Sequence, residues 1–545
     1  MMIRRAVRFA SSMGVSRAWS SIPHSSAVVR VSSVLIWAIT SKDIGNNVTS
    51  GELKGFFDQN LKGRAMLARY LTVLVALALA SCSTSGQISD ATGADGQKPN
   101  IIFIMVDDMG WGDVGYHGSE IATPNIDKLA KSGLIIDRAY SFPICSPTRA
   151  ALMTGRNPLQ YGIDGPLEND AMLPLQLKVL PEYLRDGGYK TWMVGKWHLG
   201  MASVDAMPQS RGFDSFYGHL GGFIDYYTHV YLGGLDWQRD GKSLREKGYS
   251  TDLLTREAIK LLSGQSDDKP FFMYLSYNAP HTPLQYPPET DGTYGNIKNS
   301  DRRVYAQMLT YLDTSIGSIL DKLKERNLAE NTIIIFMSDN GGLLTAGASN
   351  GKLRAGKGSA FEGGVRVPAI ISWPGKIKPA TMTKTPMFVQ DWLPTLLEAT
   401  NINHDSHGFD GMSNWSAIFR NQPKPRAEPV ILGTVRSKAV YQWPYKLVRE
   451  ADAGSATAQD RLFNISIDPE EKNDISGSNS DMTRKLAARI DAMPLRPSKG
   501  NKGPPPESLF KGPDGKFLYD IRMPETREPW ADAATRVSSE KRSGS

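Results

Sequence analysis

Four stretches of this chain are dominated by apolar residues and then end abruptly in polar ones. They span residues 101–106, 189–194, 271–277 and 332–337. Apolar runs of this length are typical of strands that are buried on both faces of a parallel sheet. Helical patterns lie between them, at residues 253–262 and 305–324. This alternation predicts an α/β fold with a large, mixed but mostly parallel sheet that is sandwiched by helices.

The polar residues that follow these runs carry the first chemical information. The runs lead to Asp107 and Asp108, to Lys196 and His198, to His281, and to Asp339 and Asn340. In an α/β sheet, ligands bind outside the carboxyl ends of the strands, so these side chains are expected at one edge. A single aspartate at a strand end is more often a helix cap or a turn residue. Clustered carboxylates, however, repel one another unless a cation compensates them, so the full set predicts a metal site.

The predicted ligands of this site are of one chemical kind. Asp107, Asp108, Asp339 and Asn340 offer only hard oxygen atoms. Oxygen ligands suit Ca²⁺ or Mg²⁺, and not zinc or copper. The sequence therefore predicts a hard divalent cation at this edge of the sheet.

Cys145 begins a further candidate motif. Residues 145–156 read Cys-Ser-Pro-Thr-Arg-Ala-Ala-Leu-Met-Thr-Gly-Arg. Pro147 is favoured in the first turn of a helix, so Cys145 is expected at a helix N-terminus. Backbone N–H groups and the helix dipole favour negative charge at that position. The alternative is a structural thiol, because free cysteine is among the most buried residue types.

The motif at residues 145–156 resembles the signature of the sulfatase family, which has an alkaline-phosphatase-like fold. Residues 195–200 and 356–368 are also similar to motifs of that family, and the resemblance covers about residues 98–493. It implies that a formylglycine-generating or equivalent maturation enzyme oxidises Cys145 to formylglycine. It also implies one bound cation, Ca²⁺ rather than Mg²⁺. The implied metal ligands are Asp107, Asp108, Asp339, Asn340 and residue 145 itself, and the implied catalytic residues are Cys145, Arg149, Lys196, His198, His281 and Lys357.

The resemblance further implies a mechanism. Arg149 holds the formylglycine, whose hydrated aldehyde attacks the sulfur of a sulfate ester. Lys196 and Lys357 neutralise the sulfate oxygens. His281 protonates the leaving alcohol, and His198 assists the expulsion of sulfate that restores the aldehyde.

The substrate is indicated by two further segments. Residues 221–229 and 249–252 look most similar to arylsulfatases that act on 4-sulfated N-acetylgalactosamine, which implies a sulfated sugar or an aryl sulfate as substrate. Asp225, Tyr226 and Tyr227 are predicted to bind sugar hydroxyls. Two alternatives remain open: a phosphodiester or phosphonate ester hydrolase of the same superfamily, and an inactive sugar-binding surface protein.

The composition limits the partners of the protein. The 545 residues are 40% hydrophobic and 22% charged, which is ordinary for a soluble globular protein. The net charge of +7 is carried by residues 1–81, which contain ten Lys or Arg and three Asp or Glu. The remainder is neutral, so no nucleic-acid partner is expected. With only Cys82 and Cys145, no disulfide framework is predicted.

Residues 66–81 have the pattern of a secretory signal. A short basic start is followed by a ten-residue apolar run and by small residues before Cys82. This ending resembles a bacterial lipobox, whose cysteine is lipidated. The run is shorter than the about 20 residues that span a bilayer. We therefore expect an exported, periplasmic or cell-surface bacterial lipoprotein that reaches the membrane only through its Cys82 anchor.

These observations divide the chain into six parts. We expect a mis-assigned N-terminal extension (1–65), a lipoprotein signal peptide (66–81), a flexible tether (82–98) and a catalytic domain (99–425). A small antiparallel sheet subdomain (426–493) and a Pro/Gly/Lys-rich tail (494–545) follow.

Overall fold

A computed structural model describes residues 97–493, except 168–170, 202, 233, 267–268, 289–291, 405–407, 452–454 and 456. The predicted extension, signal peptide, Cys82 anchor and tail lie outside the described residues, as does nearly all of the tether. Within the described part, no helix has the length and hydrophobicity needed to cross a membrane.

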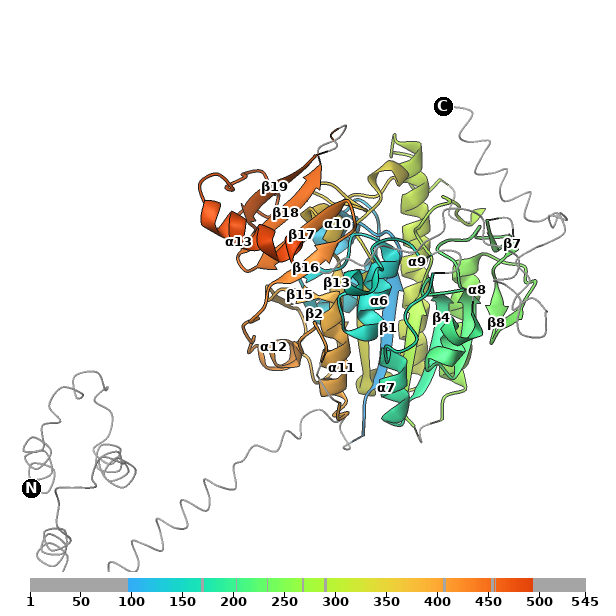
Figure 1. Ribbon diagram of the computed structural model, residues 1–545. Coiled ribbons are helices and arrows are strands. Elements are labelled where there is room, and N and C mark those ends of the chain that lie inside the picture. The colour runs from blue at the N-terminus through green and yellow to red at the C-terminus, as the bar shows by residue number, and fades with distance from the viewer. Residues whose placement is uncertain are drawn as a thin grey trace, which may run out of the picture. The chain divides into compact units, whose positions relative to one another are not determined.

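The central element is a ten-stranded mixed sheet, ordered β14-β2-β13-β11-β1-β10-β4-β5-β8-β9 (Figure 1). Its five middle strands are parallel to one another. They are β11 (Thr332–Ser338), β1 (Asn100–Val106), β10 (Phe271–Ser276), β4 (Lys190–Lys196) and β5 (Ser215–His219). The outer strands are β13 (Ala369–Ser372), β2 (Leu134–Ile136), β14 (Thr381–Thr383), β8 (Gln238–Arg239) and β9 (Lys242–Ser243). The four predicted strands are confirmed as neighbours, and β1 is buried along its whole length because helices cover both faces.

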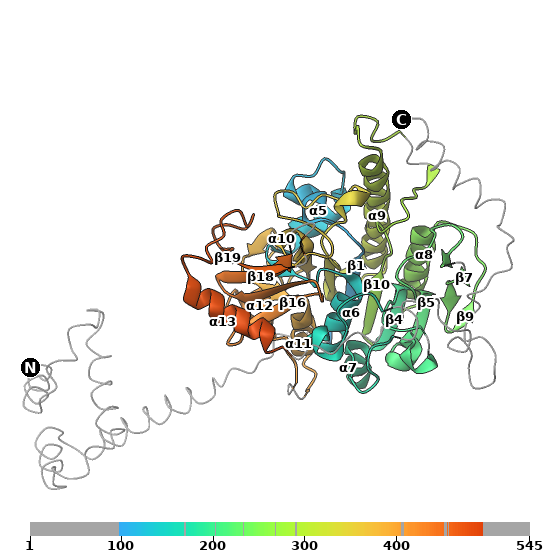
Figure 2. The ribbon, with the colours of Figure 1, turned by 45° about the horizontal axis from the view of Figure 1, so that its top comes forward.

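Helices pack on both faces of this sheet, as the two views in Figures 1 and 2 show. One layer contains α5 (Pro124–Ser132), α8 (Ser250–Ser263) and α9 (Ser300–Glu325). The other contains α6 (Cys145–Thr154), α7 (Leu180–Asp186) and α11 (Trp392–Ala399). Every residue of α6 is buried, and Gly155 ends this helix in the left-handed conformation. The helix that carries Cys145 is therefore enclosed by the fold and not laid on its surface.

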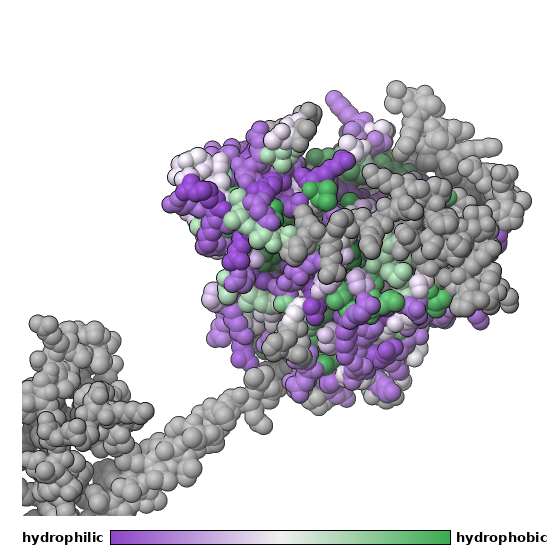
Figure 3. Space-filling view, in the orientation of Figure 1, coloured by the Kyte–Doolittle hydropathy of each residue, from purple (hydrophilic) through white to green (hydrophobic). Residues whose placement is uncertain are grey.

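A smaller antiparallel sheet follows in the chain, as predicted. It consists of β16 (Val430–Gly433), β17 (Ser437–Gln442), β18 (Tyr445–Ala451) and β19 (Ala458–Asn464), and helix α13 (Ser480–Asp491) packs against it. Val440, Leu447, Leu462, Leu486 and Ile490 form the core between sheet and helix. The outward surface of this subdomain is largely hydrophilic in Figure 3.

Short elements complete the structure. A three-stranded sheet joins β12 (Arg366–Val367), β3 (Ala139–Tyr140) and β15 (Met387–Phe388), and a two-stranded one joins β6 (Val230–Tyr231) and β7 (Gly234–Leu235). Helices α10 (Glu362–Val365) and α12 (Trp415–Arg420) are short. The first of these follows the segment that carries Lys357.

Candidate active site

The carboxyl ends of β1 and β11 bring the predicted acidic residues together. The Asp339 N–H donates to the Val106 carbonyl at 2.9 Å, and the Asp108 N–H donates to Asp339 Oδ1 at 3.2 Å. Asp108 has a positive φ of 66°, a conformation that aspartate tolerates better than most residues. The backbone therefore turns sharply after β1 and places two adjacent carboxylates at the sheet edge.

Each of the three carboxylates has its own cationic side chain. The shortest N···O distances are 2.6 Å for Lys196–Asp107, 2.8 Å for Arg149–Asp339 and 2.7 Å for Lys357–Asp108. The first two pairs are completely buried. Charge balance at this edge is thus supplied by the protein, which corrects the expectation that only a bound cation relieves the repulsion.

Burial and neighbouring charges separate the acidities of Asp107 and Asp339. For Asp107, burial opposes ionisation, but the combined fields of Lys196, His281 and Arg149 outweigh it and hold the pKa below its usual range. For Asp339, burial and the adjacent Asp107 carboxylate raise the pKa to about 6 despite Arg149.

Two oxygen atoms of this edge fit a metal ion. Asp107 Oδ1 and Asn340 Oδ1 are buried and have no hydrogen-bond partner among the described residues. Buried oxygens in this state are costly, and a hard cation would satisfy both of them. Ligand atoms of Asp107, Asp108 and His281 also lie within 4.8 Å of one another. The residues present therefore fit a divalent cation, with Asp107, Asp108 and Asn340 among the oxygen ligands predicted from the sequence.

Cys145 is the first residue of α6, as expected. It is 3% exposed, and burial raises the pKa of its thiol, although the charges of Lys196 and Lys357 act in the opposite direction. The Gly358 N–H donates to the Pro143 carbonyl at 2.7 Å. This bond ties the loop before Cys145 to the segment that carries Lys357.

Arg149 lies one helical turn after Cys145 and is fully buried. It donates to Asp339, to the Lys196 carbonyl at 3.2 Å and to Ser276 Oγ at 2.5 Å. Its Nη1 also donates to the Tyr274 hydroxyl at 3.3 Å. Tyr274 and Ser276 were not identified from the sequence. They could have been found from their spacing, because two polar residues that are two positions apart in an otherwise apolar strand lie on the same face of the sheet.

The two predicted catalytic histidines are both present at this edge. His198 is buried with a φ of 56°, and neither ring nitrogen has a hydrogen-bond partner among the described residues. Nδ1 of His281 lies 2.6 Å from the Thr282 carbonyl, so this nitrogen carries the hydrogen. Its Nε2 then lies 3.6 Å from Asp108 Oδ2. Burial lowers the pKa of both imidazoles.

A third histidine was not identified from the sequence. His219 ends β5 directly opposite Lys196 of β4 and is fully buried. The short run at residues 215–219 contains too few apolar residues to be recognised as a strand. Only the parallel pairing of β4 with β5 brings His219 to the same edge.

The three predicted sugar-binding residues form hydrogen bonds with the backbone of neighbouring loops. Tyr226 is fully buried, and its hydroxyl donates to the carbonyls of Asn278 and His281 at 2.9 and 2.8 Å. The hydroxyl of Tyr226 is therefore already engaged by protein carbonyls, and its contact with a sugar stays a prediction. Asp225 accepts from the backbone of Tyr227, whose hydroxyl donates to the Tyr286 carbonyl. Sugar contacts of Asp225 and Tyr227 stay predictions.

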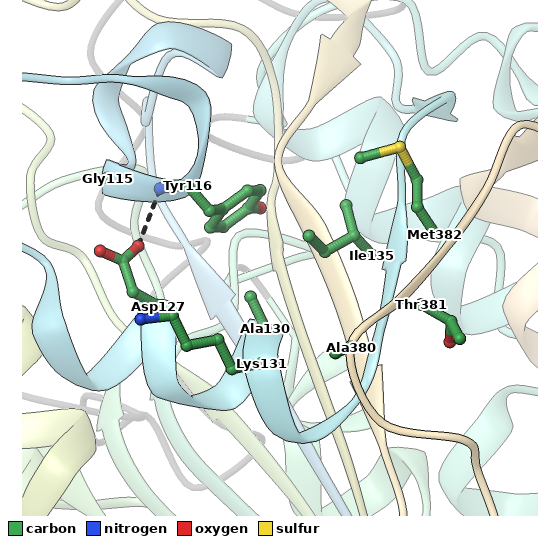
Figure 4. Close-up of a pocket in the computed structure, with 9 residues that line it drawn as sticks. All are labelled: Gly115, Tyr116, Asp127, Ala130, Lys131, Ile135, Ala380, Thr381 and Met382. Atoms are coloured by element: carbon green, nitrogen blue, oxygen red, sulfur yellow. Dashed lines mark hydrogen bonds between the residues drawn. The ribbon is translucent and has the colours of Figure 1, made fainter.

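A cavity of about 400 Å³ lies elsewhere, between α5 and β14 (Figure 4). Ala130, Ile135 and Met382 line it, and Asp127 in its wall already accepts the Tyr116 N–H. None of the residues that line this cavity belongs to the cluster around Cys145, so we do not assign the chemistry to it.

Known proteins resemble this chain in sequence. The family model described as Sulfatase matches residues 99–402. Arylsulfatase J of Mus musculus is 35% identical over 75% of this chain and 78% of its own length. N-acetylgalactosamine-6-sulfatase of Homo sapiens is 34% identical over 59% of this chain and 66% of its own length.

A solved structure shows the same architecture. The crystal structure described as Ps i-CgsB in complex with k-i-k-neocarrahexaose has a TM-score of 0.69 and 33% sequence identity. It covers 82% of this chain and 98% of its own. The likeness therefore extends over most of this chain and nearly all of the solved relative.

Proposed function

Because this chain belongs to the sulfatase family and is a sulfuric ester hydrolase, we propose that it removes sulfate from sulfated sugars at the cluster around Cys145. One observation carries the proposal. Cys145 lies at a helix N-terminus where the charges of two lysines act on it, beside three carboxylates and the Asn340 amide, and one carboxylate oxygen and the amide oxygen are buried and unsatisfied. An anionic ester and a cation are the two ligands that this arrangement favours.

The positive charges give the site its affinity for sulfate. Lys196 and Lys357 are both ion-paired to aspartates, so their positions are restricted before substrate arrives. Preorganised charges of this kind stabilise negative charge that develops on the sulfate oxygens without reorganising during the reaction. Arg149 is different, because its donors are taken by four protein groups. We assign it to fixing Asp339 and the start of α6.

Proton transfer falls to the two histidines. His281 is 13% exposed at its side chain, stacks on Phe223 and directs Nε2 toward Asp108. When Nε2 also carries a proton, which the facing Asp108 carboxylate favours, His281 is the better placed of the two to protonate a leaving sugar oxygen, since His198 lies deeper and is almost inaccessible. His198 is assigned to the release of sulfate.

Two groups outside the twenty amino acids complete the proposal. Formylglycine at position 145, made from Cys145 by a maturation enzyme, would supply the nucleophilic oxygen. A cation held by Asp107, Asp108, Asp339 and Asn340 would lower the pKa of that oxygen, and Ca²⁺ fits these ligands better than Mg²⁺, which demands stricter octahedral geometry.

The proposed substrate is a sulfated sugar of the N-acetylgalactosamine type. One relative is an N-acetylgalactosamine-6-sulfatase, and a structural relative was solved with a neocarrahexaose. Residues 221–229 are similar to enzymes that act on 4-sulfated N-acetylgalactosamine, which favours a sulfate at the 4-position of the sugar. Sugars sulfated at the 4-position and at the 6-position are therefore both tested.

The substrate class is tested by turnover of matched esters. We expect kcat/KM for p-nitrophenyl sulfate to exceed that for a p-nitrophenyl phosphodiester or phosphonate by at least about 10²-fold, because Lys196 and Lys357 are assigned to the neutralisation of sulfate oxygens. N-acetylgalactosamine 4-sulfate and 6-sulfate are compared in the same assay by released sulfate. A preference for the phosphorus esters would favour the alternative hydrolase, and no turnover at all would favour the inactive binding protein.

The proposed location is the bacterial surface or periplasm, through a lipid on Cys82. Protein expressed from Met66 in a bacterial host should sediment with membranes, and Cys82→Ala should release it, because several acyl chains hold a lipoprotein where one would not. The distribution of sulfatase activity between fractions measures this. A native protein that begins upstream of residue 82 would contradict it.

A further inference from the structure

The segment that carries Lys357 is held from two sides, which belong to different parts of the fold. On the first side, the Lys357 N–H donates to the Gly342 carbonyl at 3.1 Å, and the Gly358 N–H donates to the Pro143 carbonyl at 2.7 Å. Gly342 follows β11, and Pro143 lies two residues before Cys145. The backbone at Lys357 is thus bonded to the sheet edge and to the loop that leads into α6.

On the second side, the next residues are bonded to the C-terminal sheet. Ser359 Oγ donates to Glu450 Oε2 at 2.7 Å, and the Ala360 N–H donates to Ser437 Oγ at 2.7 Å. The Ser437 hydroxyl in turn donates to the same oxygen of Glu450. Ser437 and Glu450 face each other in the register of β17 and β18. One carboxylate of the C-terminal sheet, that of Glu450, therefore accepts hydrogen bonds from Ser359 in the Lys357 segment and from Ser437, which binds the next residue of that segment.

We propose that Glu450 is a positioning residue for Lys357, through which the C-terminal sheet sets the geometry of the active site. This rests on the proposed function, in which Lys357 neutralises sulfate oxygens. Only Gly358 separates Lys357 from Ser359, so a displaced Ser359 moves the lysine and the bond to Pro143 together. A misplacement of about 1 Å in a catalytic group can cost on the order of 10²-fold in rate.

Attachment of the C-terminal sheet does not depend on Glu450. Lys446 is fully buried and forms ion pairs with Glu362 at 3.0 Å and with Glu471 at 2.8 Å. The hydroxyls of Tyr140 and Tyr441 also donate to Glu362. This buried cluster joins the same two parts of the fold at a separate place. Glu450, by contrast, is only partly buried, so its loss should change position more than stability.

The test is a double-mutant cycle in the full-length protein, expressed in a host that converts Cys145. Glu450→Gln is expected to lower kcat/KM for p-nitrophenyl sulfate about 10-fold, within the range that misplacement produces. The same change in a Lys357→Ala background should cost less than about 2-fold, because a residue that acts through Lys357 then has nothing to position.

Glu428→Gln is the matched control. It removes an exposed carboxylate next to the same sheet, whose partner Arg489 lies at 3.1 Å, and it should leave activity within about 2-fold. The same four proteins are also compared by their affinity for inorganic sulfate, measured by titration. This measurement does not require turnover, so it can be made even if the Lys357→Ala variant is very slow. Sulfate affinity should fall in Glu450→Gln and in Lys357→Ala, but no further in the double variant.

Wild-type activity in Glu450→Gln, or an undiminished effect of Glu450→Gln in the Lys357→Ala background, would overturn the proposal. If Glu450→Gln does not fold, Ser359→Ala, which removes only the hydroxyl that reaches Glu450, takes its place and must show the same loss of additivity. Failure of the proposed function is a different outcome, since the unmutated protein would then not hydrolyse sulfate esters.

Discussion

Replacing Cys145 with alanine is expected to abolish the release of sulfate, with kcat/KM falling at least about 10⁴-fold, the scale on which loss of a nucleophile acts. The fold should survive, because the change removes a single sulfur atom at the start of α6. We expect a melting temperature within a few degrees of that of the unmutated protein. Initial rates on p-nitrophenyl sulfate and a thermal scan measure the two effects.

Cys82→Ala is the matched control for this substitution. It deletes the other thiol of the chain, outside the catalytic domain, and should leave kcat/KM unchanged. A mass spectrum of the peptide that contains residue 145 should show the aldehyde in active enzyme and the thiol in enzyme from a host without the maturation activity. Substantial turnover by Cys145→Ala would refute the mechanism. An unmodified thiol at residue 145 in fully active enzyme would exclude formylglycine from the mechanism, but Cys145 itself could still act as the nucleophile.

Removal of the divalent cation should lower activity by at least about 10²-fold, because the acidity of the attacking oxygen is then lost. The protein should not unfold, since Asp107, Asp108 and Asp339 keep the side-chain cations that neutralise them. A ligand at 100 times its Kd stabilises by about 2.7 kcal/mol, so chelation should lower the melting temperature by several degrees. Ca²⁺ should restore both quantities more fully than Mg²⁺.

Asp107→Asn serves as the control for chelation. Asp107 Oδ1 is one of the two buried oxygens that fit the cation, so in this variant a chelator should no longer shift the melting temperature. Elemental analysis before and after chelation establishes the metal content. Full activity in protein shown to be free of metal would exclude the cation from the reaction.

Much of the candidate site could be predicted from the sequence because its residues are attached to strong local patterns. Asp107 and Asp339 come directly after strongly apolar strands, and parallel strands end at the same edge whatever the rest of the fold does. Cys145 could be placed at a helix N-terminus because Pro147 has a local conformational preference. Such signals survive without tertiary information.

Other residues could not be found this way, because their roles depend on neighbours that are distant in the chain. His219 follows a weak strand and reaches the site only through its pairing with β4. Tyr226 looked suited to bind sugar, yet its hydroxyl is consumed by two carbonyls that lie more than 50 residues away. In the folded protein this side chain supports the loop that carries His281.

By itself, the sequence determined the class of fold, the sheet edge where the polar residues gather and the helix start at Cys145, since apolar periodicity, strand ends and helix starts are local properties. Only the tertiary structure decided how the charges are matched. It placed a lysine or arginine from a distant segment against each of three carboxylates, and it joined Ser359, two residues after Lys357, to Glu450, 91 residues further along the chain. Ion pairs and hydrogen bonds act over a few ångströms of space, which residue order does not reveal.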